Sequence, residues 1–161
     1  MTPKILIVDD EIETCKFLGA FLEPLGYQII TALNGEEALE KIKSEEPHLM
    51  LLDIRMPEMD GIELCARIRA IDAWHDVPII MLTSRKDMNS LTQAFMAGAN
   101  DYVTKPFDRF ELQARMRSCL RLKSELDRRR ASERRETPVA DAEVFSETPV
   151  GIGDVIGTKA G

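Results

Sequence analysis

The sequence predicts an α/β fold built on a doubly wound, five-stranded parallel sheet. Four short apolar runs each end in charged or hydroxyl residues, and helical patterns separate these runs. Near-continuous apolar strands that alternate with helices are typical of parallel sheets covered on both faces. Right-handed crossovers and short loops limit the topology, and strand order 2-1-3-4-5 is one of the common solutions. A chain of 161 residues can hold one such domain with an extension.

Each predicted element follows from the spacing of apolar residues and from breakers such as Asn34-Gly35. The expected strands cover residues 4–9, 27–31, 49–53, 78–83 and 101–104. The expected helices carry their apolar stripes over residues 12–25, 36–44, 64–71, 88–95 and, with Asp108 as N-cap, from 108 onward. Gly26 and Gly98 are expected to end the first and fourth helices, because glycine is common directly after a helix.

The last helix is expected to extend beyond the compact domain. Its apolar residues continue as far as Leu126, and a run of mixed charge follows to Glu136. From Thr137 the chain holds Pro, Gly, Ser, Thr and acidic residues without sustained periodicity, which is typical of a flexible segment. We therefore predict a domain over residues 1–122, a helical extension over 123–136 and a flexible tail over 137–161.

Composition excludes several classes of function. The net charge of −7 argues against general affinity for nucleic acid. No helix-turn-helix pattern follows residue 122, so direct DNA binding is not expected. Three widely spaced cysteines without metal-ligand spacing favour a reduced, cytoplasmic protein. The first residues do not resemble a signal peptide, and no apolar run is long enough to cross a membrane, so no membrane association is expected.

Charged and hydroxyl residues stand where the predicted strands end. They are Asp9, Asp10, Asp53, Thr83 and Lys105. In parallel sheets the carboxyl ends of the strands meet at one edge, near the point where strand order reverses. Three neighbouring carboxylates repel one another, and a hard divalent cation such as Mg²⁺ resolves that conflict. Acids with a lysine and a hydroxyl, but no histidine base, indicate phosphoryl transfer in which one aspartate is the nucleophile.

Four motifs together resemble the receiver domain of two-component response regulators, including the chemotaxis regulators. They are VDD at 8–10, LLDIRMPEMDG at 51–61, LTS at 82–84 and GANDYVTKPF at 98–107. Their joint order and spacing are highly specific, and the resemblance covers residues 3–122. It implies a flavodoxin-like fold and a phosphorylation-dependent signalling switch. Such a domain catalyses only its own phosphorylation and dephosphorylation.

The resemblance also implies roles for the residues at the strand ends. Asp53 would be the phosphoacceptor, and Lys105 would contact the phosphoryl group. Asp10 would bind Mg²⁺ directly and Asp9 mainly through water. Asp53 and the backbone carbonyl of Arg55 would complete the protein ligands of the metal.

Three further expectations concern the surroundings of this site. The resemblance implies that Thr83 and Tyr102 form a switch pair, which remodels the face made by the fourth helix, fifth strand and fifth helix. It also implies a cis bond between Lys105 and Pro106, as X-Pro bonds permit. The side chains of Arg55 and Arg85 flank the site, and we expect them to tune the lifetime of the phosphoryl group.

The implied partners are a sensor histidine kinase or histidine phosphotransfer protein, which donates the phosphoryl group, and a downstream protein target. Formation of a homodimer on phosphorylation stays open. The chain could also be a receiver fragment whose effector domain lies beyond the helical extension. A haloacid-dehalogenase-like phosphatase would need a DxD motif after the first strand, which Asp9-Asp10-Glu11 does not match. A flavodoxin-like electron carrier would need a phosphate loop rich in Ser, Thr and Gly there.

Overall fold

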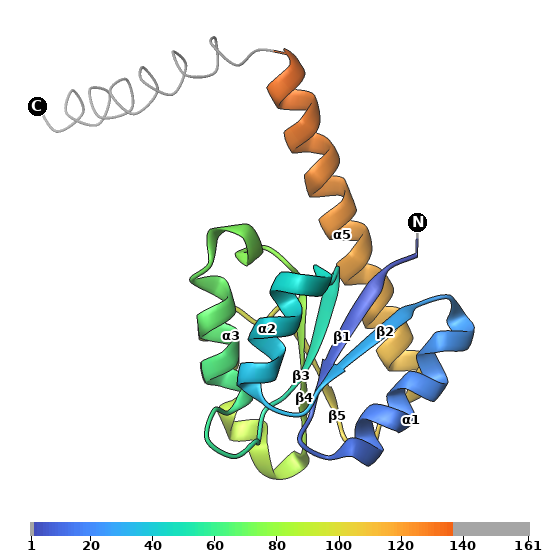
Figure 1. The fold of residues 1–161 in the computed structure, drawn as a ribbon, viewed down its shortest axis with the longest axis vertical. Helices are drawn as coiled ribbons and strands as arrows, with labels where there is room; N and C mark the ends of the chain where they lie inside the picture. The colour runs from blue at the N-terminus through green and yellow to red at the C-terminus, as the bar shows by residue number, and fades with distance from the viewer. Residues whose placement is uncertain (1, 137–161) are drawn as a thin grey trace, which may run out of the picture. The chain divides into compact units, whose positions relative to one another are not determined.

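A computed structural model describes residues 2–136, and its five strands form one parallel sheet of order β2-β1-β3-β4-β5 (Figure 1). The strands are β1 (Lys4–Val8), β2 (Gln28–Ala32), β3 (Leu49–Asp53), β4 (Ile79–Thr83) and β5 (Asp101–Thr104). The α-helices are α1 (Ile12–Leu22), α2 (Gly35–Glu45), α3 (Gly61–Arg69), α4 (Leu91–Ala97) and α5 (Arg109–Glu136). Three 3₁₀ segments are η1 (Glu23–Leu25), η2 (Asp72–Trp74) and η3 (Arg85–Ser90). The predicted fold class and strand order are confirmed.

Two apolar layers cover opposite faces of the sheet, because successive side chains of a strand point to opposite faces. In β1, Leu6 and Val8 pack with side chains of α2, α3 and α4. Ile5 and Ile7 pack with side chains of α1 and α5. Both faces of the sheet are therefore buried, which explains why the strand sequences are continuously apolar and do not alternate between apolar and polar residues. Figure 1 shows α2 and α3 on one side of the sheet and α1 on the other.

Polar side chains and glycines fix the ends of several helices. The side-chain oxygens of Asn34, Asp60 and Asp108 accept hydrogen bonds from backbone N–H groups in the first turns of α2, α3 and α5, respectively. Gly26 and Gly98 have φ of +101° and +114°, in the left-handed region that favours glycine. The predicted N-cap at Asp108 and the predicted stops at both glycines are confirmed.

The fourth helix differs from its prediction. The apolar spacing predicts an α-helical stripe through Met88, Leu91 and Phe95, but residues 85–90 form the 3₁₀ segment η3 and only Leu91–Ala97 is α-helical. Because a 3₁₀ turn has three residues rather than 3.6, Met88 leaves the buried face. Met88 and Phe95 are exposed, and Leu91 and Ala94 supply the buried side of α4.

The first and last helices bury less of their predicted stripes. Ile12 and Leu25 are exposed, while Cys15, Leu18 and Leu22 are buried. η1 replaces the last turn of the predicted first helix, which turns Leu25 outward. In α5 the fully buried residues are Leu112 and Met116, and Leu126 is exposed.

The chain divides into two units, Met1–Lys123 and Ser124–Gly161. α5 continues through the first described residues of the second unit to Glu136. The predicted domain and extension boundaries stay predictions, and the predicted tail over 137–161 lies outside the described residues. Within the described part of the chain, no helix has both the length and the apolar character needed to cross a bilayer.

Candidate functional site

Three carboxylates meet at the carboxyl edge of the sheet. β1 and β3 are neighbours in parallel register, with Val8 opposite Leu52, so the residues that follow, Asp9 and Asp53, come side by side. Asp9, Asp10 and Asp53 each place one carboxylate oxygen within 4.8 Å of the others. Asp9 and Asp53 are buried, whereas Asp10 is exposed. The predicted acidic cluster therefore exists, and two of its three charges are shielded from water.

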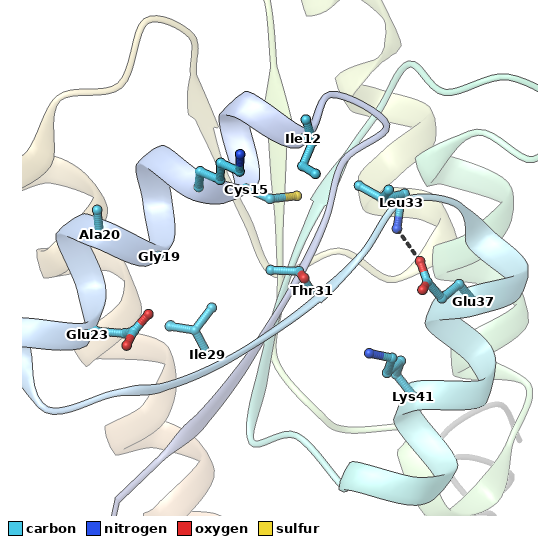
Figure 2. Close-up of a pocket in the computed structure, with 11 residues that line it drawn as sticks. Ile12, Cys15, Gly19, Ala20, Glu23, Ile29, Thr31, Leu33, Glu37 and Lys41 are labelled. Atoms are coloured by element: carbon cyan, nitrogen blue, oxygen red, sulfur yellow. Dashed lines mark hydrogen bonds between the residues drawn. The ribbon is translucent and has the colours of Figure 1, made fainter.

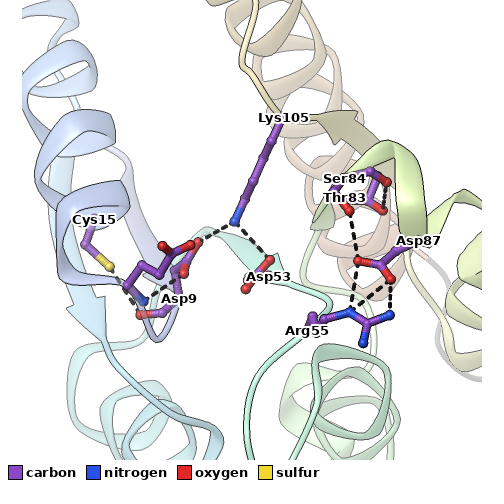
Figure 3. A network of polar contacts seen from close by, with 9 residues as sticks. Asp9, Cys15, Asp53, Arg55, Thr83, Ser84, Asp87 and Lys105 are labelled. Carbon is purple, nitrogen blue, oxygen red and sulfur yellow. Dashed lines mark hydrogen bonds and ion pairs between the residues drawn. The ribbon is translucent and has the colours of Figure 1, made fainter.

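Lys105, which directly follows the edge strand β5, brings a cation to this cluster. Its Nζ donates hydrogen bonds to Asp9 Oδ2 at 2.9 Å and to Asp53 Oδ1 at 3.1 Å (Figure 3). The bond between Lys105 and Pro106 is cis, as predicted. A single ammonium thus lies between two buried carboxylates, and this arrangement leaves the cluster with more negative than positive charge.

The pKa of Asp53 reflects this imbalance. Burial is the main cause that raises the pKa of the Asp53 carboxyl from 3.8 to about 6, and the neighbouring Asp9 raises it further against the opposing effect of Lys105. For Lys105, burial lowers the pKa, but hydrogen bonds and attraction to Asp9 and Asp53 outweigh that effect and raise it. Oxygen-only donors with uncompensated negative charge fit a hard divalent cation such as Mg²⁺.

Gly61 allows the loop after β3 to fold back on the strand end. A Cβ at Gly61 would lie 2.1 Å from the backbone oxygen of Asp53 and 2.9 Å from the Cα of Ile54. The Gly61 N–H donates to the backbone oxygen of Ile54 at 2.8 Å. Sequence reasoning treats Gly61 as a loop breaker, whereas the structure shows that the backbone of Asp53 leaves no space for a side chain there.

The predicted switch residues lie at the edge of the site. Thr83 ends β4 and is buried, and its hydroxyl donates to the backbone oxygen of Ser84 at 3.1 Å. The Tyr102 ring is half-buried between the Phe95 ring, at 6.2 Å between centroids, and the Arg115 guanidinium, at 5.8 Å from the ring centroid. Tyr102 therefore contacts both α4 and α5.

Sequence reasoning missed Asp87, a buried carboxylate on η3. Arg55 Nε donates to both of its oxygens, at 3.0 and 3.3 Å, and the Nη2 group of Arg55 completes the ion pair. Ser84 Oγ donates to Asp87 Oδ2 at 3.0 Å. Asp87 stands in a charged, irregular stretch of the sequence, where no periodicity marks it as buried. Arg85, which is predicted to flank the site, is exposed.

A cavity of about 530 Å³ opens onto these groups. It is lined by Asp10, Glu11, Asp53, Arg55, Met56, Pro57, Ser84, Asp87 and Lys105. Figure 3 shows Asp53 between Lys105 on one side and the Arg55–Asp87 pair on the other. The cavity thus joins the buried Asp53 carboxylate, two cationic side chains and part of the acidic cluster, a set of groups that is suited to phosphoryl transfer.

A second cavity, of about 560 Å³, lies between α1, β2 and α2. Figure 2 shows Glu23 at one end of this cavity and Glu37 and Lys41 at the other. The Glu37 carboxylate accepts a hydrogen bond from the Leu33 N–H at 2.6 Å. Because its charged groups are spread along its length, this cavity lacks the converging acids of the first one.

The comparisons with known proteins agree with this geometry. The response regulator receiver domain model matches residues 5–117, and the chain belongs to that family. The receiver family match favours the receiver interpretation over the phosphatase and electron-carrier alternatives.

Curated relatives are longer than this chain. A probable transcriptional regulator, ycf27, of Cyanophora paradoxa is 46% identical over 118 residues, which are 73% of this chain and 48% of the relative. The alkaline phosphatase synthesis transcriptional regulatory protein PhoP of Bacillus subtilis is 43% identical over 121 residues, 75% of this chain and 50% of the relative. The chain spans about half the length of these relatives.

Solved receiver structures superpose on the same part. A CheY-like response regulator receiver domain protein from Methanospirillum hungatei gives a TM-score of 0.72 at 29% identity, covering 78% of this chain and 98% of its own. The chemotaxis protein CheY4 of Vibrio cholerae gives 0.70 at 28% identity, covering 74% and 99%. The flavodoxin-like receiver fold is therefore confirmed by structure as well as by sequence.

Proposed function

We propose that this domain is a phosphorylation-dependent switch in which Asp53 accepts a phosphoryl group. The observation that carries the proposal is the placement of the buried Asp53 carboxylate, 3.1 Å from the Lys105 ammonium and inside the acidic cluster. A sensor histidine kinase or a histidine phosphotransfer protein is the expected donor. The domain acts on no other substrate, and it catalyses only its own phosphorylation and dephosphorylation.

In the transfer, one Asp53 oxygen attacks the phosphorus of a phosphohistidine. The new P–O bond forms as the P–N bond breaks, and the bonding electrons leave with the imidazole nitrogen. The pKa of about 6 leaves Asp53 mostly ionised at pH 7, so the nucleophile needs no general base. Lys105, which already donates to Asp53, is placed to donate to a phosphoryl oxygen instead.

The donor set fits Mg²⁺, and Asp9, Asp10, Asp53 and the backbone carbonyl of Arg55 are the groups that would hold it. When bound, the cation would neutralise charge on the acids and on phosphoryl oxygens. The residues around it keep the nucleophile oriented: the strand end fixes Asp53, and the close approach of Gly61 fixes the backbone behind it.

The readout is assigned to Thr83 and Tyr102. The Thr83 hydroxyl would leave the backbone oxygen of Ser84 for a phosphoryl oxygen, and the Tyr102 ring would turn inward. Tyr102 contacts Phe95 of α4 and Arg115 of α5, so a turn of the ring alters the face made by α4, β5 and α5. α4 also presents exposed apolar side chains, Phe95 at 43% beside the Tyr102 ring and Met96 at 84%, which suit contact with a protein target or with a second copy of this chain.

Output and location are part of the same proposal. We place the domain in the cytoplasm, acting through protein contacts and without direct DNA binding of its own. The longer relatives are named as transcriptional regulators, so a receiver that belongs to a larger protein with an effector domain is the second candidate. Light scattering with and without beryllofluoride, a phosphoryl mimic, tests whether the modified domain dimerises.

The direct test uses acetyl phosphate as a small phosphodonor, with Mg²⁺ and detection by intact mass. Asp53→Asn should reduce phosphoryl uptake at least 100-fold, because the amide is not a nucleophile. Asp60→Asn is the matched control, since Asp60 caps α3 at a position where Asn serves equally well. Uptake by Asp53→Asn at the wild-type rate would refute the proposal.

A further inference from the structure

Asp87 carries a charge that is buried and depends on few partners. Asp87 is 5% exposed, and it accepts hydrogen bonds from the Arg55 guanidinium and the Ser84 hydroxyl. The hydrogen bonds from Arg55 are the main cause that lowers the pKa of Asp87, so this carboxylate is ionised at neutral pH. An ionised carboxylate without its cation is costly inside a protein. The position of η3 therefore depends on Arg55.

The Arg55 side chain is far more exposed than the Asp87 side chain. Its side chain is 79% exposed, and Asp87 is the partner recorded for its guanidinium. Arg55 belongs to the loop after β3, whereas Asp87 lies 32 residues further along the chain. Because most of its side chain is already exposed to water, Arg55 can change partner at small cost to itself. The cost of such a change falls on Asp87.

Both residues line the cavity that contains Asp53. Arg55 also stands only two residues after Asp53 in the sequence. A phosphoryl group on Asp53 carries about 1.5 to 2 negative charges and three acceptor oxygens. Because the carboxylate loses its own charge in the acyl phosphate, the cavity gains at most about one negative charge, placed further out on the phosphoryl oxygens. Guanidinium groups bind phosphoryl oxygens through paired hydrogen bonds, as they do carboxylates. The modified Asp53 and the unmodified Asp87 are therefore competitors for one guanidinium.

We propose that Arg55 is a shared side chain, which holds Asp87 while Asp53 is unmodified and moves to the phosphoryl group when Asp53 is modified. Arg55 is then a phosphoryl-binding residue, and Asp87 is the partner that competes for it. This inference rests on the proposed function of Asp53. It assigns to the Arg55 side chain a role separate from that of its backbone carbonyl.

The exchange of partners releases η3. Without Arg55, Asp87 keeps one hydrogen bond, from Ser84, and must reach water to remain ionised. η3 runs directly into α4, whose first residue is Leu91. The same event that adds a cation to the phosphoryl group thus loosens the segment that precedes α4, and this links the site to the face described above.

The experiment measures the apparent affinity for beryllofluoride, with Mg²⁺, in four proteins: wild type, Asp87→Asn, Arg55→Gln and the double variant. Asp87→Asn weakens the competitor for Arg55, so it should bind beryllofluoride about fivefold more tightly than wild type. Arg55→Gln should bind it about fivefold more weakly. In the Arg55→Gln background, Asp87→Asn should have no further effect. Arg67→Gln, which breaks the exposed pair with Glu63 on α3, is the matched control and should bind as wild type does.

Amide hydrogen exchange over residues 84–91 gives an independent readout. Wild type should exchange at least tenfold faster there with beryllofluoride than without it, and Asp87→Asn should be fast in both states. A purely structural role for Asp87 would instead weaken beryllofluoride binding in Asp87→Asn, including in the Arg55→Gln background. That result, or unchanged exchange over 84–91, would overturn the inference.

Failure of the proposed function is a different result. If wild type takes up neither beryllofluoride nor the phosphoryl group from acetyl phosphate, the assignment of Asp53 is wrong. If wild type binds the mimic through Asp53 but the two variants are additive, Asp53 stands and only the sharing of Arg55 is refuted.

Discussion

The two edges of the sheet handle charge in opposite ways. At the amino edge, the half-buried Arg69 guanidinium donates to backbone oxygens of Gly98 at 2.9 Å, Trp74 at 3.1 Å and Val77 at 2.7 Å, and to the side-chain oxygen of Asn100 at 2.8 Å. At the carboxyl edge, Lys105 shares one ammonium between Asp9 and Asp53. The first arrangement satisfies its charge with neutral acceptors, whereas the second leaves negative charge in excess.

This difference separates a structural site from one that can bind something. The partners of Arg69 tie the end of α3 to the segments that precede β4 and β5. At the other edge, the raised pKa of Asp53 shows that burial and Asp9 disfavour its charge. A bound cation would relieve that cost. Burial of charge is therefore common to both edges, and the excess of negative charge distinguishes the carboxyl edge.

The largest expected loss of stability comes from a substitution at the amino edge of the sheet. Arg69→Met should destabilise the domain by about 3 kcal/mol, because it removes a charged donor and leaves several acceptors partly buried without hydrogen bonds. Phosphoryl uptake from acetyl phosphate should stay within twofold of wild type at temperatures where the variant is folded. Urea unfolding and an uptake assay check the two halves of this prediction. Loss of uptake in folded protein would show that the edges are coupled.

A smaller effect is expected at Gly98, which closes α4. Its φ of +114° disfavours any Cβ, and a Cβ there would lie 2.6 Å from Cγ of Arg69. Gly98→Ala should cost about 2 kcal/mol, part from the backbone and part from displacement of the Arg69 side chain. Thermal unfolding measures the cost. In an Arg69→Met background the cost should fall, since the shorter side chain gives way, and an unchanged cost would assign all of it to the backbone.

The smallest effect has the opposite sign and tests the carboxyl edge. Without divalent cations at pH 7, Asp53→Asn should stabilise the domain by about 1 to 2 kcal/mol, because it removes a disfavoured charge. The pKa of Asp53 is about 6 in the folded protein, above its ordinary 3.8, so the folded state holds the proton more tightly. The gain should be full above pH 6 and disappear as the pH falls toward 4.

Mg²⁺ provides the control for this last effect. Because the cation binds the ionised carboxylate, it should raise the melting temperature of wild type more than that of Asp53→Asn. If Asp53→Asn is less stable than wild type at pH 7 in chelator, the carboxylate is not under the strain inferred from its surroundings.

The strands and the acidic cluster were predictable because both depend on short-range patterns. Each predicted strand differs from the observed one by at most one residue at either end, since fully buried strands show continuous apolar runs. Asp53 and Lys105 are 52 residues apart, yet each stands at a strand end. The parallel topology alone brings such positions together.

The conformation of η3 and the burial of Asp87 could not be predicted, because both depend on packing between loops. η3 is a 3₁₀ segment, so the helical spacing of Met88 gives a wrong expectation of burial. Asp87 is buried only because Arg55, from another loop, neutralises it. Asp87 carries no periodic signal, and charged residues in a loop are exposed in most proteins. The roles of Thr83 and Tyr102 stay predictions.

The two apolar layers have a mechanical consequence. α4 rests on the layer that contains Leu91 and Ala94, whereas α1 and α5 rest on the layer that contains Leu18 and Leu112. Since the sheet separates these layers, a shift of η3 and α4 requires no repacking beneath α1. A protein that grips α1 would meet the same shape before and after the shift. The sheet thus separates α4, which the proposed switch moves, from α1, whose packing on the opposite layer can stay the same.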